Sequence, residues 1–336
     1  MNKLKRTLSL LLALLLLSSA LVGCTSKRTK QEQTVIGTCE GFDVLYEELR
    51  YVTLTYREIL EGTYGEGIWD DPATAEQYRD ELETVVWSMM LNNYAVLATC
   101  MEYGMTRESM DSDVINEAVE QQVKDTIAEY GSKSDFRADL EEMHMTEHFL
   151  RFCLRVAYLE NELKYILTND LGLIPNDPFT FLEWLNEGNF VYVQHILIKN
   201  DVGDDVEANR AKAEEIRGQI LRGEARIEDF VGTKVNEDLK NNAPYFLVRD
   251  VYVEEIERAA FALRASGDVS EVVDTADGFY VLVRMEYTDT DLESKVQDLL
   301  SSYQWAIAEK ISMAKKDEIS IELNDYGKTI DLLEIE

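Results

Sequence analysis

The chain has 336 residues, 46% of them hydrophobic, and a formal net charge of -32 at pH 7. This length predicts two domains, each with an apolar core of its own. The large negative charge argues against nucleic acid as a partner and against a protein that lies flat on an anionic membrane.

The N-terminal segment, residues 1–23, has the features of a secretory signal. Basic residues precede the apolar run Leu8–Leu17, which is too short to span a bilayer. The sequence Leu21-Val22-Gly23-Cys24 resembles a lipobox, which implies cleavage before Cys24 and diacylation of its thiol. We therefore expect a cell-membrane protein, lipid-anchored at the extracytoplasmic face, with residues 24–33 as a tether. An uncleaved anchor helix is the alternative.

Three further cysteines, Cys39, Cys100 and Cys153, follow the lipobox. Their spacing matches neither a CxxC motif nor a disulfide framework, so the sequence predicts no metal site. The sequence leaves open whether two of these three cysteines form a disulfide. The sequence implies no cofactor.

The first half of the chain after the tether is expected to be almost entirely helical. A short strand is predicted at Thr34–Cys39, before a turn at Glu40-Gly41 and a helix over Val44–Glu61. Asp71-Pro72 has the arrangement that begins a helix, and Gly104 would end it. The apolar stripe predicted for this helix consists of Tyr78, Leu82, Val85, Met89, Leu97 and Met101. Further helices are predicted at Asp113–Tyr130, at Ser134–Met143 and from Thr146 onward.

The segment that follows predicts a small sheet with two helices. Alternation in Phe190–Lys199 puts His195 on one strand face among apolar residues, and taken alone this strand is most simply explained by a core histidine. A helix over Glu207–Arg222 would carry Ala211, Ile216 and Ile220 on its apolar face. Beyond it the sequence predicts a strand at Tyr245–Val248, a helix at Glu254–Leu263, a turn at Asp277-Gly278 and a strand at Phe279–Val283.

Four motifs in this segment occur in an order known from one protein family: QHILI, GEARIEDF, IERAAFAL and VSEVVDTADGFYVLV. Their order resembles the parvulin family of peptidyl-prolyl isomerases over Phe190–Glu286. The resemblance implies a small α/β domain at residues 189–287, whose antiparallel sheet holds a shallow proline-binding cleft.

The resemblance also implies a catalytic set. His195 matches the family's first cleft histidine, and Asp238 lies at or near a position that is aspartate or cysteine in the family. Tyr280 stands where the family's second histidine follows a Gly-Tyr pair. The catalytic candidates are therefore His195, Asp238 and Tyr280.

The candidate substrate-binding residues come from the same resemblance. Tyr252 aligns with the family's cleft methionine, Ile256 with its cleft phenylalanine, and Thr275 with the threonine before the second histidine. Asn242-Ala243-Pro244 replaces a glycine-rich stretch. The changes at Tyr280 and Ile256 favour a non-catalytic alternative, whereas the presence of His195 favours an isomerase.

The helical half, at residues 34–188, resembles the N-terminal domains of SurA-type and PrsA-type foldases, especially in FRADLEEMHMTEHFLRFCLRVAYLENEL. Within residues 288–336, the amphipathic helix Leu292–Ala314 is expected to pack on this half, and Ile319–Leu323 to pair with the first strand. The predicted fold is α+β: a mostly helical, discontinuous chaperone-like domain with an inserted parvulin-like domain on an antiparallel sheet.

These observations predict a lipid-anchored, extracytoplasmic foldase that isomerises X-Pro bonds, chaperones secreted polypeptides, or does both. Its partners would be unfolded or newly secreted chains that contain proline, and the membrane through Cys24. The alternative from another class is a degenerate parvulin-like chaperone or scaffold without isomerase activity.

A remote alternative comes from His144-Met145-Thr146-Glu147-His148, which has the HxxEH form of inverted zinc proteases. Two histidines on one helix would hold zinc there, with the glutamate as general base. Thr146 is typical of a helix N-cap, which would put the two histidines on different elements.

Overall fold

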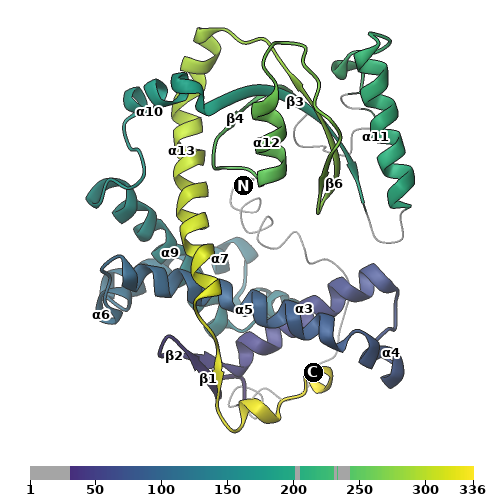
Figure 1. Ribbon diagram of the computed structural model, residues 1–336. Coiled ribbons are helices and arrows are strands. Elements are labelled where there is room, and N and C mark those ends of the chain that lie inside the picture. The colour runs from purple at the N-terminus through teal and green to yellow at the C-terminus, as the bar shows by residue number, and fades with distance from the viewer. Residues whose placement is uncertain (1–30, 201–204, 231–232, 234–242) are drawn as a thin grey trace. The chain divides into compact units, whose positions relative to one another are not determined.

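A computed structural model describes residues 31–200, 205–230, 233 and 243–336, and the chain divides into two compact units (Figure 1). Among these residues, unit 1 comprises 31–163 and 310–336, and unit 2 comprises 164–309. Cys24, the expected lipidation site, and Asp238, one of the three expected catalytic residues, lie outside the described residues. Of the helices within the described ranges, none is both long and apolar enough to cross a membrane.

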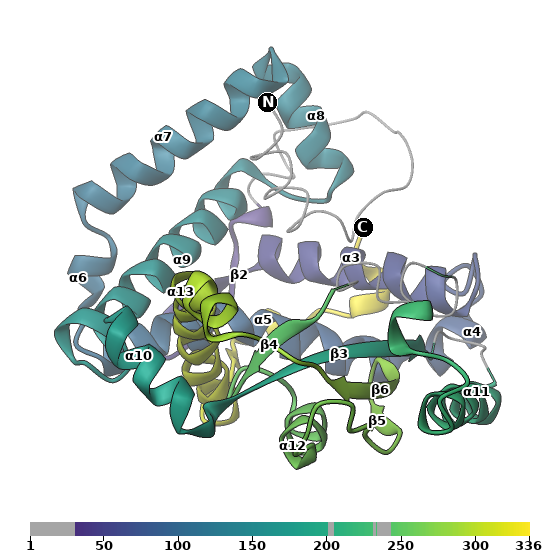
Figure 2. The same ribbon diagram turned by 90° about the horizontal axis from the view of Figure 1, so that it is seen from above.

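Unit 1 is mostly helical, with one small antiparallel sheet. The central strand β1 (Val35–Cys39) pairs with β2 (Phe42–Leu45) on one side and with β7 (Glu322–Leu323) on the other. The helices are α3 (Tyr46–Tyr64), α4 (Pro72–Gln77), α5 (Arg79–Glu102), α6 (Arg107–Met110), α7 (Asp113–Tyr130), α8 (Lys133–Glu142) and α9 (Glu147–Tyr165). Figure 2 shows α7 and α9 as neighbouring helices, and Arg151 of α9 forms an ion pair with Glu120 of α7 at 2.5 Å.

The first helix begins later than the sequence predicted, because Val44 and Leu45 belong to β2. Glu40 and Gly41 both adopt positive φ, at 50° and 76°. This conformation is typical of the two-residue turns that join antiparallel strands, and Cys39 pairs directly with Phe42 across it. The hairpin therefore uses residues that the helical pattern had included.

The helix predicted from Asp71 to Gly104 is two helices. Asp71 begins α4 as expected, since its carboxylate accepts a hydrogen bond from the Thr74 backbone N–H at 3.0 Å. Tyr78 lies between α4 and α5, with φ -99° and ψ 3°. The large side chains that α5 buries are Leu82, Val86, Met90, Tyr94, Val96 and Leu97. The sequence wrongly placed Val85 and Met89 in this stripe, in place of Val86 and Met90. Both pairs follow Leu82 at helical spacing, so only the packing of neighbouring elements distinguishes them.

A buried carboxyl group lies at the start of α3. Glu48 accepts hydrogen bonds from the Leu45 backbone N–H at 2.9 Å and from the Tyr94 hydroxyl at 2.8 Å. Burial raises the pKa of Glu48 to about 7, although both hydrogen bonds oppose this shift. The carboxyl is therefore close to half protonated near neutral pH.

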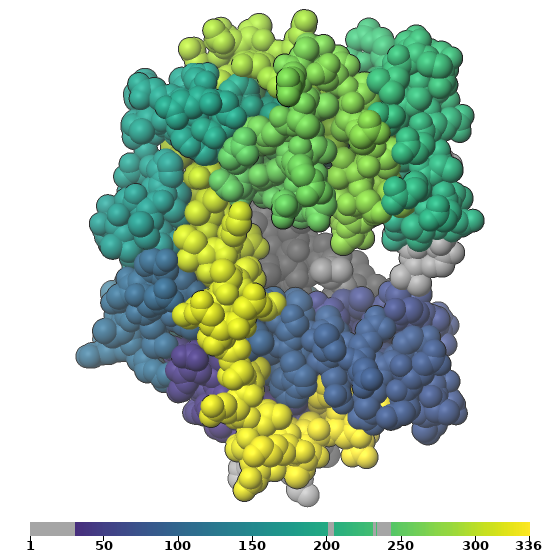
Figure 3. Space-filling view, in the orientation of Figure 1, coloured from purple at the N-terminus to yellow at the C-terminus, as the bar shows by residue number. Residues whose placement is uncertain are grey.

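The C-terminal residues complete unit 1. β7 pairs with β1 through Gly37↔Leu323, which is the pairing that the sequence predicted between these segments. Asp331 forms an ion pair with Arg79 of α5 at 2.8 Å. Figure 3 shows the C-terminal residues, in yellow, beside the purple residues of the first strands. Short 3-10 helices occur at Lys315–Asp317, Gly327–Thr329 and Leu332–Glu334.

Unit 2 is built on a four-stranded antiparallel sheet in the order β4-β3-β6-β5. The strands are β3 (Phe190–Lys199), β4 (Tyr245–Val248), β5 (Val273–Thr275) and β6 (Gly278–Arg284). The helices are α10 (Pro178–Trp184), α11 (Val206–Leu221), α12 (Glu254–Ala262) and the first part of α13 (Asp289–Ala314). Shorter helical segments are Ile166–Asp170, Leu185–Asn189 and Ile227–Asp229. The expected α+β architecture with antiparallel sheets is thus confirmed.

Alternate residues of β3 face two different cores. Val193 and Leu197 pack with Ile256 of α12, whereas Ile196 and Ile198 pack with α11 on the opposite face. Figure 1 shows the strands between these two helices. On α11, Ala213 and Ile216 are buried, and Ala211, which was expected in their place, is exposed.

The long helix α13 differs from the prediction in its packing. Leu292 and Leu300 belong to a buried cluster with Phe181 of α10 and with Phe190 and Phe246 of the sheet, all within unit 2. The sequence had assigned this apolar face to the helical half. The aromatic residues of β3, β4 and α10 supply an apolar surface for it within the same unit, and that surface is not evident before the strands are paired.

Candidate active site

The imidazole of His195 lies inside unit 2, and one of its nitrogens contacts a tyrosine hydroxyl. His195 is buried on β3, and its Nδ1 lies 2.9 Å from the Tyr245 hydroxyl. The antiparallel register pairs Tyr245 with Val193, which places its ring diagonally across from His195 on the same face of the sheet. The two rings are nearly perpendicular, with centroids 5.5 Å apart.

Tyr280 approaches His195 from the other neighbouring strand. It lies on β6 opposite Leu197, which again puts its ring diagonally across from His195. The ring centroids of His195 and Tyr280 are 5.2 Å apart in an edge-to-face arrangement. His195 is therefore held between tyrosines from the strands on both sides of β3.

Two substrate-binding candidates lie on the same side of the sheet. Ile256 of α12 is buried in the cluster that contains Tyr280. Tyr252, in the loop before α12, lies beside Tyr245 with a centroid separation of 5.9 Å, and 38% of its surface is exposed. We name His195, Tyr245, Tyr252, Ile256 and Tyr280 the His195 site.

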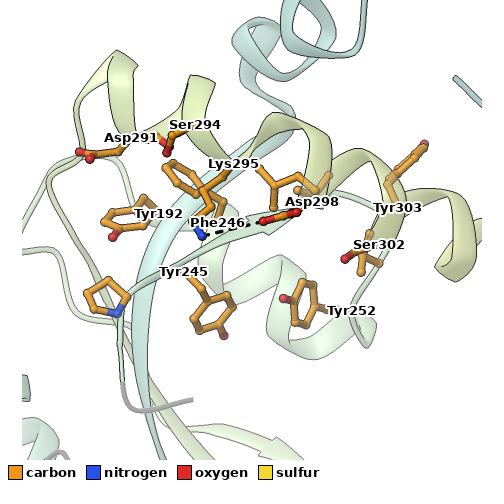
Figure 4. Close-up of a pocket in the computed structure, with 14 residues that line it drawn as sticks. Tyr192, Tyr245, Phe246, Tyr252, Asp291, Ser294, Lys295, Asp298, Ser302 and Tyr303 are labelled. Atoms are coloured by element: carbon orange, nitrogen blue, oxygen red, sulfur yellow. Dashed lines mark hydrogen bonds and ion pairs between the residues drawn. The ribbon is translucent and has the colours of Figure 1, made fainter. Parts of the chain in front are cut away.

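A pocket of about 450 Å³ adjoins the His195 site (Figure 4). Tyr245 and Tyr252 line it from the side of the sheet, together with Tyr192 and Phe246. The first part of α13 lines it from the other side. Figure 4 shows Tyr245 and Tyr252 below the polar side chains of α13, among which Lys295 contacts Asp298.

Residues of unit 2, including those of the His195 site, match a known protein family. A family model for rotamase, the PPIC-type PPIASE domain, matches residues 195–286, which begin at His195. Unit 2 contains a parvulin-type peptidyl-prolyl isomerase domain. The isomerase domain thus coincides with the four motifs found in the sequence, and the His195 site lies within it.

Similarity to foldases extends beyond the isomerase domain. The chain is 22% identical over 287 residues to the foldase protein PrsA of Caldanaerobacter subterraneus subsp. tengcongensis, covering 83% of this chain and 82% of that protein. Among solved structures, the peptidylprolyl isomerase PrsA from Bacillus anthracis matches with a TM-score of 0.37 and 14% identity, over 68% of this chain and 96% of that chain. One of two SurA-like chaperones of Campylobacter jejuni matches with a TM-score of 0.29 and 10% identity, over 87% and 99%.

Thr275 lies at the far end of the β5–β6 hairpin of the isomerase domain. Its hydroxyl donates a hydrogen bond to the carbonyl oxygen of Gly278 at 2.9 Å. Gly278 has φ 137°, and a Cβ there would lie 2.2 Å from the Ile198 carbonyl oxygen. The structure therefore gives Thr275 a contact within the hairpin turn, whereas His195, Tyr252, Ile256 and Tyr280 gather around one face of the sheet.

Tyr245 is the residue of the His195 site that the sequence did not single out. The sequence predicted β4 as a short strand, and no motif pointed to a functional residue within it. The alternation Tyr245-Phe246-Leu247 offered a signal, since it predicts that Tyr245 and Leu247 share a face. Only the register of β4 against β3 identifies that face as the one that carries His195.

The HxxEH sequence does not form a metal site. His144 has φ 56° and lies before α9, where its Nε2 is 2.8 Å from Glu58. His148 lies on α9 and contacts Glu47, while Glu147 pairs with Arg137. The two histidines therefore bind different carboxylates, and no group of metal-ligating side chains occurs among the described residues.

The three described cysteines are free thiols. Burial raises the pKa of Cys39 to about 11 and that of Cys100 to about 12, and it also raises the pKa of Cys153. Thiols of this kind are poor nucleophiles near neutral pH, because almost none is ionised. Cys39 and Cys100 are best described as small buried side chains, and Cys153 is partly buried.

Proposed function

We propose that this protein is a foldase that isomerises X-Pro bonds of unfolded polypeptides at the His195 site. The observation that carries the proposal is the histidine held between Tyr245 and Tyr280 inside a domain of the isomerase family. Asp238, which lies outside the described residues, is proposed as a further member of the catalytic set. Tyr252 and Ile256 are proposed to contact the proline and its neighbours.

The reaction needs no covalent step. The barrier to rotation about an X-Pro bond is about 18 to 20 kcal/mol, and the uncatalysed change takes tens of seconds or more. The transition state has a twisted imide whose carbonyl is no longer conjugated with nitrogen. A site accelerates rotation if it binds that twisted form more tightly than either planar form.

The residues of the His195 site can contribute to this in two ways. Tyr252, which is 38% exposed, offers a ring on which the proline could pack, and Ile256 and Tyr280 belong to the buried cluster on the same side of the sheet. The linked polar groups of His195 and Tyr245 supply a hydrogen-bonding dipole where the carbonyl of the twisted imide would lie.

We also propose that the protein acts outside the cytoplasm and is anchored through lipid on Cys24. The support is the lipobox at residues 21–24 and the secretory features of the segment before it. Newly secreted chains would then be the substrates. Their slow prolyl isomerisation is a step that limits folding.

A chaperone or scaffold without isomerase activity is the second candidate. The burial of His195, Ile256 and Tyr280 favours it, since each of these side chains is at most 8% exposed. The replacement of a family histidine by Tyr280 favours it as well. Both candidates bind unfolded polypeptides, so binding alone does not distinguish them.

Two assays on the whole protein separate the candidates. A proline-limited refolding assay and a peptide isomerisation assay report on catalysis, and suppression of aggregation reports on chaperoning. We expect the natural protein to catalyse both proline reactions and His195→Ala to reduce the rate while aggregation suppression is retained. Equal rates for His195→Ala and the natural protein, with undiminished chaperoning, would leave the non-catalytic candidate.

A further inference from the structure

The pocket of Figure 4 lies at the β4 edge of the sheet and shares Tyr245 and Tyr252 with the His195 site. Its other aromatic residues, Tyr192 and Phe246, belong to the opposite face of the sheet, because side chains alternate along β3 and β4. Tyr245 contacts His195 through its hydroxyl and also lines the pocket. Tyr252 lies beside Tyr245 and lines the pocket too. A polypeptide that extends from the His195 site past Tyr245 would reach this pocket at the edge of β4.

One wall of the pocket is the edge strand β4, half of whose backbone groups are turned away from the sheet. The Arg249 N–H donates to the Asn189 carbonyl, which fixes the residues of β4 that bond to β3. Because bonding residues alternate along an antiparallel pair, Phe246 and Val248 point their N–H and C=O groups away from β3. Both residues line the pocket. Such an edge can pair with an extended peptide.

The opposite wall is a stripe of α13 that carries more negative than positive charge. Asp291, Lys295 and Asp298 lie four and then three residues apart, so they share one face of the helix. Lys295 Nζ is 3.9 Å from the Asp298 carboxylate, so one ammonium group serves two carboxylates and the stripe keeps a net negative charge. The Asp291 carboxylate accepts hydrogen bonds from the hydroxyl and N–H of Thr288, and these lower its pKa. Asp291 is therefore charged at neutral pH.

Nearby carboxylates contribute to raised pKa values of two tyrosines that line the pocket. The pKa of Tyr192 is raised by burial and, to a smaller extent, by the charge of Asp291. The pKa of Tyr303 is raised by burial and by Asp250. Aromatic rings next to a stripe of net negative charge are the surroundings that a guanidinium or ammonium group binds.

We propose that this pocket binds an arginine or lysine side chain of the same extended polypeptide whose proline occupies the His195 site. The cation would contact Asp291 and lie against the rings of Tyr192 and Phe246, while the peptide backbone pairs with β4. At about 3.3 Å of advance per extended residue, a basic residue about two to four positions from the proline fits this arrangement. The inference deepens the proposed foldase function and rests on it.

The test compares two short fluorescent peptides that each contain one proline, with arginine or glutamate about three residues away. Binding to the whole protein is followed by fluorescence anisotropy at low salt. We expect the arginine peptide to bind about fivefold more tightly, which is the scale for partly exposed charge pairs. Near 1 M salt, where the Debye length is about 3 Å, the preference should vanish.

Variants locate the preference in the pocket. Asp291→Asn combined with Asp298→Asn should reduce the ratio of the two affinities to about twofold or less. Glu293→Gln, on an exposed face of the same helix, removes the same kind of charge outside the pocket and should leave the ratio unchanged. Retention of the full preference in the double variant would overturn the proposal.

The outcome can be separated from that of the proposed function. Isomerisation of an uncharged proline peptide by the natural protein tests the His195 site alone, so a catalytically silent protein can still show the arginine preference. Equal affinities of the natural protein for the arginine and glutamate peptides would refute the pocket assignment even if isomerisation is fast. If the double variant instead loses a dimer with no change in peptide affinity, the occupant is a second copy of the chain and the proposal is wrong.

Discussion

The Nδ1 atom of His195 and the hydroxyl of Tyr245 lie 2.9 Å apart, on neighbouring strands of the sheet in unit 2. The contact gives the buried imidazole a polar partner that reaches toward the surface, because Tyr245 also lines the pocket beside the sheet edge. Tyr245 therefore positions His195 in the proposed reaction.

Replacing Tyr245 by phenylalanine keeps the ring and removes the hydroxyl. We expect kcat/KM for a proline peptide to fall by about twofold to tenfold, since such a hydrogen bond contributes roughly 0.5 to 1.5 kcal/mol. The pH profile of kcat should shift too, because the hydroxyl contacts a titratable ring. Tyr165→Phe, at an exposed tyrosine of unit 2, is the matched control. A lower rate with an unchanged pH profile would indicate a purely structural role.

Replacing Tyr280 by histidine restores the residue that the parvulin resemblance implies at this position. We expect a several-fold rise in kcat/KM, up to about tenfold if about 1.4 kcal/mol of transition-state binding is regained. Tyr280→Phe should show no rise, which separates the imidazole from a change in ring packing. Adding Ile256→Phe should raise activity further but lower stability by roughly 1 to 3 kcal/mol, because Ile256 is buried in a packed cluster. No rise in any of these variants would contradict the assignment of Tyr280.

Glu48 should make the protein less stable as the pH rises toward neutrality. Its pKa is about 7 in the folded protein against 4.5 for an ordinary glutamate, so unfolding releases a proton between these values. The contribution of Glu48 to the free energy of unfolding is full below about pH 4.5 and falls as the pH rises toward 7. Above the folded-state pKa it no longer changes, and the total decrease is on the order of 3 kcal/mol.

The test is thermal unfolding of the natural protein and of Glu48→Gln at several pH values between these limits. Glutamine stays uncharged, so the variant should gain stability relative to the natural protein as the pH rises. Glu66→Gln, at an exposed glutamate, is the control and should follow the natural protein. Parallel curves for Glu48→Gln and the natural protein would show that Glu48 ionises normally.

Deleting residues 319–336 should loosen unit 1 and leave unit 2 folded. The deletion removes the strand that pairs with β1 and the ion pair of Asp331 with Arg79. It also removes the backbone oxygens of Ile335 and Glu336 that accept hydrogen bonds from two arginines of α3. Hydrogen exchange should rise in β1 and α3 while β3 and β6 stay protected.

A longer deletion from residue 289 provides the comparison. It removes Leu292 and Leu300 from the core of unit 2, so protection should then be lost in β3 as well. If the shorter deletion exposes β3 as strongly as β1, the division of the chain into these two units is wrong.

Cys24→Ala should abolish lipid modification and leave the protein unprocessed or mislocalised. The lipobox motivates this prediction, since diacylation requires the cysteine thiol. Mass spectrometry of the N-terminal peptide from the membrane fraction measures the modification. An unmodified Cys24 in the natural protein would refute the anchor.

Several elements follow from the sequence because their signals are local. The bounds of β3 and α7 agree with the residues at which the alternating and helical patterns start and stop. Asp71 and Thr146 cap helices as their residue types predict, since the Thr146 hydroxyl accepts from the Phe149 N–H at 2.9 Å.

Other elements could not be predicted because two local patterns were equally good. Val44 and Leu45 fit a helix as well as a strand, and the pairing of Phe42–Leu45 with β1 decides between them. The apolar stripe of α5 passes through Val86 and Met90, which the tertiary structure buries at 0% and 2% exposure. Such choices depend on contacts between segments far apart in the chain.

By itself, the sequence determined the order of strands and helices in the isomerase domain and the place of His195 on a buried strand. It also determined the resemblance of this domain to parvulins. These depend on side-chain periodicity and on short motifs, which are properties of neighbouring residues. The tertiary structure alone decided that Tyr245 is the partner of His195 and that α13 packs on the sheet of unit 2. The physical reason is that strand register and the pairing of apolar faces set which distant side chains meet, and neither is encoded in the spacing of residues along one segment.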